Sequence, residues 1–391
     1  MEKYSYAVLG GGRQGLASAY DLARFGDASE IRLADCNPQV AQRGARRLND
    51  LLGGDLVKAF TLDAGDEAAV TEFLKPVDGV LVAVPFRLIP IVTRAVLAAQ
   101  VHATDMGGHT QTVRWQLEQT DRALAADIAL VPDCGMGPGM NITMALLAME
   151  QMDQPLHVHI YDGGLPQNPV PPWNYAQFFH INGLTNEYDG VAFFLDQGKV
   201  TEVPCFERQE EVIFPDPIGG LEAAVTSGGL STMPWTFAGK LQSLENKTLR
   251  YPGHWEWMRA YRELGLFSEE PVSMNGGTII PREFYHHLFT AQLPHDVPDV
   301  CLMRVICTGM HQGRKWQSRV ETAAQYNPDT GFLAMEQWTG WHASIFLILA
   351  VQGQIPRGVV SVENAVSGST FLKEARRRSY EIEVSSGPLE N

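Results

Sequence analysis

The stretch YAVLGGGRQGLASAYDLARFG, residues 6–26, decides the fold. Residues 6–9 are apolar and predict a short strand, and the apolar residues after the glycines recur at helical spacing. Between them lie Gly10, Gly12 and Gly15, in the G-x-G-x-x-G order of a dinucleotide-binding turn. Gly10 would permit the tight turn, Gly12 would let the backbone approach a pyrophosphate, and Gly15 would let the helix pack closely on the strand. The helix N-terminus would then face the phosphates with free N–H groups.

The end of the second predicted strand indicates which dinucleotide binds. Asp35 lies there, and its carboxylate should accept hydrogen bonds from a ribose diol and repel a 2′-phosphate, which favours NAD. Arg13, Arg43 and Arg46 would counteract that repulsion, so NADP remains a second option. A strongly apolar strand at residues 77–85 ends where the cofactor usually passes. The predicted cofactor contacts are Gly10, Gly12, Arg13, Gln14, Gly15, Asp35, Val84 and Pro85.

The pattern of segments predicts an α/β protein. Strands and helices alternate over residues 1–134, which indicates a Rossmann-type, doubly wound parallel sheet. From residue 135 to 335 the segments shorten, alternate in polarity and carry many Pro, Gly and aromatic residues, which indicates a second α+β domain with a mixed sheet. An apolar helix is expected from Ala343. We expect residues 336–391 to return to the first domain.

Composition excludes several classes of partner. The formal net charge of −15 argues against nucleic acids and anionic membranes, which require a basic face. The five cysteines form no CxxC pair, which is typical of a reducing compartment. The sequence shows no leader peptide, no apolar run of membrane-spanning length and no HExxH or HxxEH motif. We therefore expect a cytoplasmic protein without a metal site that acts on a small molecule.

Three further segments carry candidate site residues. Asp105 lies at the carboxyl end of a predicted strand, where it would contact the cofactor or a substrate amine, or cap the next turn. The segment KTLRYPGH, residues 247–254, offers Arg250 as a bidentate fork for a carboxylate, although such cations also occur in solvated surface loops. The segment FFHINGLTNEY, residues 178–188, offers His180 and Glu187, although a lone histidine is more often structural.

These segments together resemble the saccharopine dehydrogenase-like family, and within it the L-lysine 6-dehydrogenase branch. The similar stretches span nearly the whole chain in family order: GGGRQG at 10–15, TDMGG at 104–108, DCGMGPGMN at 133–141, YDGGLPQNP at 161–169, GLTNEYDG at 183–190, TSGGLSTMP at 226–234, KTLRYPGH at 247–254 and TG at 339–340. The resemblance implies a Rossmann domain interrupted by a substrate-binding and dimerisation domain. It also implies nicotinamide-dependent chemistry at a carbon–nitrogen bond. The segment QWTGWHA, residues 337–343, departs from the family pattern, and its two tryptophans and histidine would reshape the pocket.

The predicted activity is NAD(P)-dependent oxidative deamination of the terminal amine of L-lysine or a similar amine, giving a semialdehyde that cyclises. Arg250 would bind the carboxylate, with Thr232, Tyr251 and Lys247 as helpers. Histidine is the side chain best suited to act as a base near neutral pH, so His180 is the predicted base, and Asp105 and Glu187 are rivals if burial raises their pKa values.

Two alternatives remain open. One is an opine-type reductase, similar to saccharopine or carboxynorspermidine dehydrogenase, with a second cation cluster from Arg208, Lys247 and Arg282. The other is a non-catalytic dinucleotide-binding sensor. An exposed sheet edge in the second domain would favour a homodimer or homotetramer.

Overall fold

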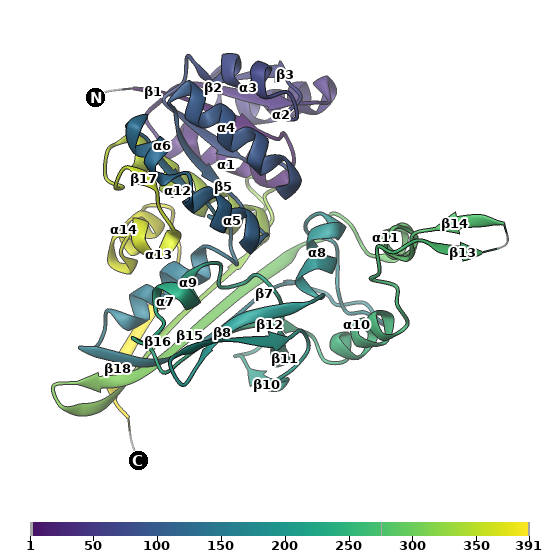
Figure 1. Ribbon diagram of the computed structural model, residues 1–391, viewed down its shortest axis with the longest axis vertical. Coiled ribbons are helices and arrows are strands. Elements are labelled where there is room, and N and C mark those ends of the chain that lie inside the picture. The colour runs from purple at the N-terminus through teal and green to yellow at the C-terminus, as the bar shows by residue number, and fades with distance from the viewer. Residues whose placement is uncertain (1–2, 275, 390–391) are drawn as a thin grey trace. The chain divides into compact units, whose positions relative to one another are not determined.

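The computed structural model describes residues 3–274 and 276–389, which form two compact units (Figure 1). Unit 1 is made of the described parts of Met1–Gln151, Leu230–Thr236 and Asn327–Tyr380. Unit 2 is made of the described parts of Met152–Gly229, Phe237–Tyr326 and Glu381–Asn391. The chain therefore passes from one unit to the other five times, and its last described segment lies in unit 2.

Unit 1 contains a seven-stranded sheet in the order β17-β6-β5-β4-β1-β2-β3, in which every pair is parallel. Strands β1 to β6 lie in the order 3-2-1-4-5-6, which is the order of a doubly wound dinucleotide-binding fold. Strand β17 adds a seventh strand beside β6. The predicted Rossmann fold is thus confirmed. The strands are β1 (Tyr4–Leu9), β2 (Ala28–Asp35), β3 (Val57–Thr61), β4 (Gly79–Val82), β5 (His102–Asp105), β6 (Ala129–Val131) and β17 (Gly358–Val359).

Helices cover this sheet because its strands are apolar on both faces. Every residue of β4 is buried, as expected for a central parallel strand. Ala7 and Leu9 of β1 belong to the core that also contains residues of α3 and α4, whereas the alternate residue Val8 faces Gly15 of α1. The helices of unit 1 are α1 (Arg13–Phe25), α2 (Pro38–Leu52), α3 (Glu67–Leu74), the 3-10 turn η1 (Phe86–Leu88), α4 (Ile89–Ala99), α5 (Thr110–Leu117), α6 (Thr120–Ala125), α7 (Met140–Met149), α9 (Met233–Thr236), α12 (Ala334–Val351), α13 (Val362–Ala365) and α14 (Gly368–Arg377).

The C-terminal apolar helix is longer than the sequence predicted. Helix α12 begins at Ala334, not at Ala343, because the Glu336 carboxylate accepts a hydrogen bond from the Leu333 N–H at 3.0 Å and caps its first turn. Helix α12 packs on α1 through Gly340, where an added Cβ would lie 2.8 Å from the Gln14 carbonyl oxygen. A side chain at this position would push the two helices apart.

The two tryptophans and the histidine of residues 337–343 are therefore helical core residues of unit 1. Trp338 and His342 are buried, and Trp341 stacks on Tyr380 with ring centroids 5.8 Å apart. The His342 ring lies 2.8 Å from the Cys134 carbonyl oxygen and 3.2 Å from the Thr143 hydroxyl. Burial lowers the pKa of His342 to about 4, so the ring is neutral at physiological pH.

Unit 2 is built on a nine-stranded mixed sheet with the path β10-β11-β12-β7-β15-β16-β18, from which β8 and β9 branch at β12. Strand β12 is parallel to β7, and the other pairs are antiparallel. The strands are β7 (Gln154–Pro166), β8 (Val191–Asp196), β9 (Lys199–Pro204), β10 (Glu210–Ile213), β11 (Gly220–Val225), β12 (Ser243–Arg250), β15 (Asp299–His311), β16 (Arg314–Gln325) and β18 (Ile382–Pro388). A separate hairpin, β13 (Val272–Met274) and β14 (Gly277–Ile279), and helices α8 (Ile181–Glu187), α10 (His254–Glu263) and α11 (Pro281–Gln292) complete unit 2.

The compact units differ from the predicted ranges 1–134, 135–335 and 336–391 at four places, one of which is the segment 327–335, which belongs to unit 1. Helix α7 belongs to unit 1 because it packs against α13 and α14. The short α9 also belongs to unit 1, since Thr232 and Thr236 donate hydrogen bonds to Glu363 of α13. Strand β18 belongs to unit 2 because it pairs with β16.

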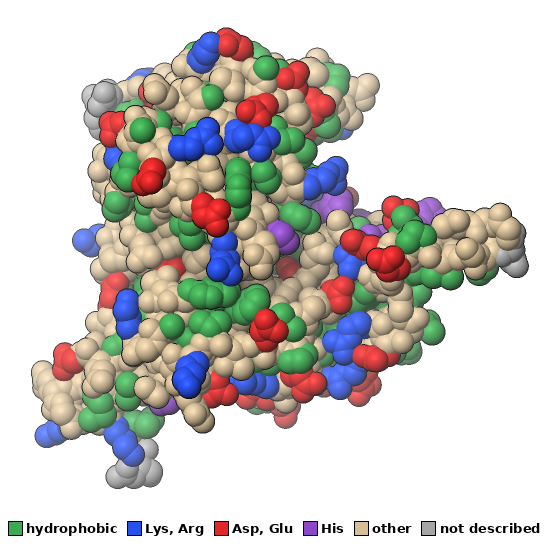
Figure 2. All heavy atoms as spheres, in the orientation of Figure 1, with side chains coloured by type: hydrophobic (Ala, Val, Ile, Leu, Met, Phe, Trp, Pro, Cys, Tyr) green, Lys and Arg blue, Asp and Glu red, His purple; other side chains and the backbone are tan. Residues whose placement is uncertain are grey.

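The surface carries both signs of charge. Figure 2 shows Lys and Arg side chains interspersed with Asp and Glu side chains over the visible face. Among the described residues, no helix combines the length and the apolar character needed to cross a membrane. The expected homodimer or homotetramer stays a prediction.

A buried ion pair joins the first and last helices of unit 1. Arg378 donates to both carboxylate oxygens of Asp21, at 2.7 and 2.9 Å, and both side chains are fully buried. We expect Arg378→Met to lower the free energy of unfolding by about 3–5 kcal/mol, because it leaves the Asp21 carboxylate buried without its partner. Urea denaturation measures the loss.

The matched control for this prediction is the neighbouring Arg377, whose side chain is 53% exposed and pairs with Glu374 on the surface. Arg377→Met should cost no more than about 1 kcal/mol. Equal losses in the two variants would show that burial of the Asp21–Arg378 pair does not matter.

Candidate functional site

The glycine turn between β1 and α1 has the shape that a dinucleotide requires. Gly10 has φ of +105°, and a Cβ there would lie 2.2 Å from the Ala83 carbonyl oxygen. A Cβ at Gly15 would lie 1.9 Å from the Gly10 carbonyl oxygen. At Gly12, in contrast, an added Cβ would meet nothing within 4 Å, so the backbone is open to an approaching group. The three glycines thus match their three predicted roles.

Asp35 is fixed beside this turn at the carboxyl end of β2. Its two oxygens accept hydrogen bonds from the backbone N–H groups of Gly11, at 2.9 Å, and Asn37, at 2.8 Å. Each oxygen keeps a second lone pair, so the carboxylate fits the predicted contact with a ribose diol. Arg43 and Arg46 lie exposed on α2 nearby in sequence.

The remaining predicted cofactor contacts also lie in unit 1. Arg13 and Gln14 form the start of α1, and the Arg13 guanidinium lies 3.9 Å from the Glu336 carboxylate. Val84 is half-buried and Pro85 is exposed, just beyond β4. All predicted cofactor contacts therefore lie on β1, β2, β4, α1 or the turns that follow them.

Asp105 is buried within a network at the carboxyl edge of the same sheet. One carboxylate oxygen accepts from the backbone N–H groups of Gly107, at 2.9 Å, and Asp133, at 3.2 Å, and the other accepts from the Gln116 amide at 2.7 Å. Burial raises the pKa of Asp105. Burial and the nearby Asp105 raise the pKa of Asp133 to about 7. This network holds the loop after β5 against the loop after β6.

The central charged group of unit 2 is Arg250, the last residue of β12, whose residue surface is 3% exposed. Its Nε donates to the Tyr188 hydroxyl at 2.8 Å, and its Nη1 donates to the Leu249 carbonyl oxygen at 2.9 Å. The guanidinium lies 4.8 Å from the Tyr175 ring centroid and 5.7 Å from the Trp255 ring centroid. Arg250 is thus held by aromatic faces and neutral oxygens.

Glu187, at the end of α8, brings a carboxylate to this arginine without forming a hydrogen bond. Its Oε2 lies 3.8 Å from Nη2 of Arg250. Burial raises the pKa of Glu187 to about 7 although Arg250 lowers it, and the nearby Asp162 raises it further. Asp162 itself is buried on β7, its pKa is raised to about 7 by burial, and the Asn246 amide donates to it at 3.4 Å. Two carboxyl groups that titrate near neutral pH therefore accompany Arg250.

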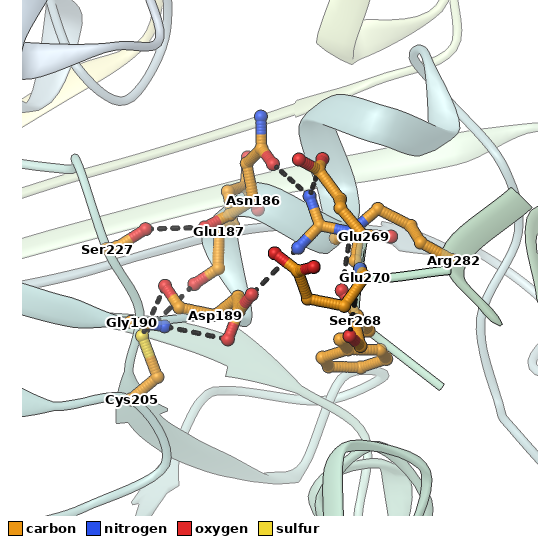
Figure 3. A network of polar contacts seen from close by, with 12 residues as sticks. Asn186, Glu187, Asp189, Gly190, Cys205, Ser227, Ser268, Glu269, Glu270 and Arg282 are labelled. Atoms are coloured by element: carbon orange, nitrogen blue, oxygen red, sulfur yellow. Dashed lines mark hydrogen bonds and ion pairs between the residues drawn. The ribbon is translucent and has the colours of Figure 1, made fainter. Parts of the chain in front are cut away.

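A hydrogen-bond network fixes the end of α8 and hence Glu187 (Figure 3). The Ser227 N–H donates to the Glu187 carbonyl oxygen at 2.8 Å, and the Ser227 hydroxyl donates to the Asn186 carbonyl oxygen at 2.5 Å. Arg282 donates to the Asn186 side chain at 3.0 Å and to Asp189 at 2.7 Å. Arg282, on α11, therefore stabilises the end of α8, and its guanidinium is paired with the carboxylates of Asp189 and Glu269.

The other predicted substrate contacts have hydrogen-bond or ion-pair partners of their own. Lys247 lies on the opposite face of β12, where it pairs with Glu210 and lies 3.4 Å from Glu245. Tyr251 donates to the Pro166 carbonyl oxygen at 3.1 Å and packs on the apolar cluster that contains Leu249. Thr232 lies in unit 1, where its hydroxyl donates to Glu363 at 2.9 Å.

His180 is exposed at the start of α8, and its Nδ1 accepts a hydrogen bond from the Asn182 N–H at 3.2 Å. It thus lies at the opposite end of the helix from Glu187. Its role as a base stays a prediction.

Sequence reasoning missed three residues of this site: Asp162, Tyr175 and His254. Asp162 could have been found from strand alternation, since it and Ile160 share a face opposite to Tyr161. Tyr175 carried no comparable signal, and His254 was only marked as part of the KTLRYPGH segment, because the roles of both depend on contacts between distant segments. Among the described residues, no group of three His, Cys, Asp or Glu side chains could hold a metal ion.

Two family models together match nearly the whole chain. The Saccharopine dehydrogenase NADP binding domain matches residues 6–131, and the Saccharopine dehydrogenase C-terminal domain matches residues 135–379. A solved structure of saccharopine dehydrogenase (L-Glu forming) from Saccharomyces cerevisiae is similar over 98% of this chain and 100% of that chain, with 16% identity and a TM-score of 0.78. A probable dehydrogenase from Thermotoga maritima is similar over 98% of each chain, with 12% identity and a TM-score of 0.43.

The match to the NADP binding domain and the glycine turn agree on the cofactor, which is a nicotinamide dinucleotide held by unit 1. The choice between NAD and NADP depends on Asp35 and stays a prediction in favour of NAD.

The glycine turn gives a prediction that separates binding from folding. Gly12→Ala should leave the urea midpoint unchanged, because its Cβ meets no atom, but should weaken NAD binding by about tenfold or more, equivalent to about 1.4 kcal/mol. Gly15→Ala should instead lower the free energy of unfolding by about 1–3 kcal/mol, because its Cβ collides with the Gly10 carbonyl. Calorimetric titration with NAD and urea denaturation measure the two effects. Unchanged NAD affinity in Gly12→Ala would contradict the assignment of the turn.

Proposed function

This chain belongs to the saccharopine dehydrogenase family, and from that premise we propose that it oxidises the terminal amine of L-lysine, or of a similar amino acid, with NAD as the preferred cofactor. Family membership makes it a nicotinamide-dependent oxidoreductase. The choice of substrate is argued from the site around Arg250.

The observation that carries this proposal is the pair formed by Arg250 and Glu187. A guanidinium has five N–H donors, and Arg250 uses one at Nε and one at Nη1, so further donors remain for a carboxylate. The Glu187 carboxylate, 3.8 Å from Nη2, is placed to accept from an ammonium beside that carboxylate. An α-amino acid carries both groups on one carbon. We therefore assign the α-carboxylate of the substrate to Arg250 and its α-ammonium to Glu187.

This assignment leaves the terminal amine at the other end of the side chain for the reaction. The nicotinamide, when bound, supplies the hydride acceptor. In balance, R–CH₂–NH₃⁺ and water become R–CHO and NH₄⁺, with one hydride transferred and one proton released. The released proton comes from the terminal ammonium and needs a base, for which His180 and Asp105 stay the predicted candidates. The aldehyde then condenses with its own α-amine and cyclises.

The opine-type reaction is the second candidate, because the family takes its name from saccharopine dehydrogenase. Its product carries additional carboxylates and calls for additional free cations. The three cations predicted for that role all have carboxylate partners: Arg208 with Glu245 at 3.1 Å, Lys247 with Glu210, and Arg282 with Asp189 at 2.7 Å. This pairing favours the single-carboxylate substrate.

The non-catalytic sensor is less well supported. Two carboxyl groups of the site, the partly exposed Glu187 and the buried Asp162, have pKa values raised to about 7. Such perturbation is typical of sites that bind or transform a charged substrate.

An absorbance assay for reduced nicotinamide tests the reaction. Purified protein with L-lysine and NAD⁺, at mildly alkaline pH and without a keto acid, should produce NADH. NADH consumption that requires an amino acid together with a keto acid or semialdehyde would instead establish the opine-type reaction. Cofactor binding without turnover in either direction would establish the sensor.

The pH dependence gives a prediction specific to Glu187. Its carboxyl must be ionised to bind an α-ammonium, so the preference for L-lysine over 6-aminohexanoate, in kcat/KM, should rise with pH through about 7. Glu187→Gln should remove this rise and reduce the preference by about 10- to 100-fold, the usual worth of a hydrogen bond to a charged group. The kcat/KM for 6-aminohexanoate, which lacks the α-amino group, should be the same in Glu187→Gln as in the wild-type protein.

Asp162 supplies the companion variant. It raises the pKa of Glu187, so Asp162→Asn should shift the rise to lower pH. A shift to higher pH, or an unchanged profile in Glu187→Gln, would contradict the assignment of Glu187.

A further inference from the structure

A chain of four polar groups leads away from Arg250 into the core of unit 2. The Nε of Arg250 lies 2.8 Å from the Tyr188 hydroxyl, which lies 2.9 Å from Nε2 of His254. The Nδ1 of His254 lies 2.9 Å from the Trp173 carbonyl oxygen. Tyr188 and His254 are completely buried, so their polar atoms must form hydrogen bonds with protein groups rather than with water.

The direction of every hydrogen bond in this chain is determined by its two ends. A carbonyl oxygen only accepts, so Nδ1 of His254 carries the proton. Burial and Arg250 lower the pKa of His254 to about 3, so the ring is neutral and Nε2 is an acceptor. The Tyr188 hydroxyl must then donate to Nε2, and its oxygen accepts from Arg250. Reversing one bond would leave two buried donors, or two buried acceptors, facing each other.

We propose that His254 is a positioning residue that acts through Tyr188 to hold the guanidinium of Arg250 in the orientation that binds the substrate carboxylate. This inference rests on the proposed function, in which Arg250 binds that carboxylate. With its proton given to His254, the Tyr188 oxygen presents its lone pairs to Nε. The Nε edge is then occupied, and the donors of Nη1 and Nη2 that remain free are the ones left for a ligand.

The packing around Arg250 shows why a positioning group is needed. Tyr175 lies against both the guanidinium, at 4.8 Å, and the His254 ring, at 5.2 Å between centroids. Aromatic faces attract a guanidinium but do not select which of its edges points outward. The hydrogen bond to Tyr188 makes that selection, and His254 fixes the hydroxyl that makes it.

Two substitutions of His254 separate this role from a merely structural one. His254→Gln places an amide oxygen near the position of Nε2, where it can accept from Tyr188 but loses the bond to Trp173. His254→Asn keeps a donor near Nδ1 for the Trp173 carbonyl but does not reach Tyr188. A structural role of the histidine predicts similar defects in the two variants, whereas the proposed role predicts a defect in His254→Asn and rescue in His254→Gln.

The readout is ligand binding to the full-length protein with NADH, measured by calorimetry. The two ligands are 6-aminohexanoate and 1-aminohexane, which differ in whether a carboxylate or a methyl group ends the chain. Tyr188→Phe and His254→Asn should each weaken 6-aminohexanoate binding by about tenfold, as expected for loss of one hydrogen bond to a charged group, and leave 1-aminohexane unchanged. His254→Gln should stay within about threefold of the wild-type protein for both ligands.

Controls distinguish failure of this inference from failure of the proposed function. His157→Gln alters a histidine that contacts the Ser243 hydroxyl at 2.8 Å on the opposite face of the sheet. This substitution should leave the affinity for both ligands unchanged. Arg250→Lys should abolish the preference for the carboxylate. Retention of that preference in Arg250→Lys would overturn the role of Arg250 itself and the inference with it.

If Arg250→Lys loses the preference but Tyr188→Phe and His254→Asn keep it, the carboxylate assignment stands and the positioning role of His254 is overturned. The positioning role is also overturned if His254→Gln and His254→Asn are equally weakened.

Discussion

The structure of unit 2 depends on a buried guanidinium that no carboxylate neutralises by hydrogen bonding. Arg250 is 3% exposed, and its ion-pair partner Glu187 is 3.8 Å away. A buried charge is costly unless its donors are satisfied. Strand β12 therefore ends against Tyr188, Tyr175 and the Leu249 carbonyl, and α8 is fixed by Ser227 and Arg282 so that Glu187 stays beside the arginine. The arrangement leaves N–H donors of Arg250 available, as the proposed α-amino acid substrate requires.

Features encoded by local sequence could be predicted. The parallel sheet, the glycine turn and Asp35 at the end of β2 depend on short-range spacing and on the backbone freedom of glycine, and the structure has them where the sequence indicated. Arg250 was identified from its neighbours in KTLRYPGH and from the family resemblance. The mixed sheet was recognised from the alternation of His157, His159 and Tyr161 with apolar residues, which is the period of a strand.

Features that depend on three-dimensional neighbours could not be predicted. Lys247 and Tyr251 lie close to Arg250 in sequence, yet an odd number of residues along a strand places a side chain on the opposite face. The raised pKa of Glu187 needs the burial and the Asp162 charge that only the fold supplies. Helix α12 begins at Ala334, before the apolar segment from which the sequence predicted it. The Glu336 cap stabilises this earlier start, and the absence of a side chain at Gly340 lets the added turns pack on α1.

A crystal structure of the protein with NADH and L-lysine tests the central claim most directly, because NADH cannot accept a hydride and the substrate stays intact. The account predicts the α-carboxylate within hydrogen-bonding distance of Arg250, the α-ammonium against Glu187, and the terminal amine at the far end of an extended side chain. A lysine bound in reverse, with its terminal amine against Glu187, or a carboxylate bound away from Arg250, would contradict it.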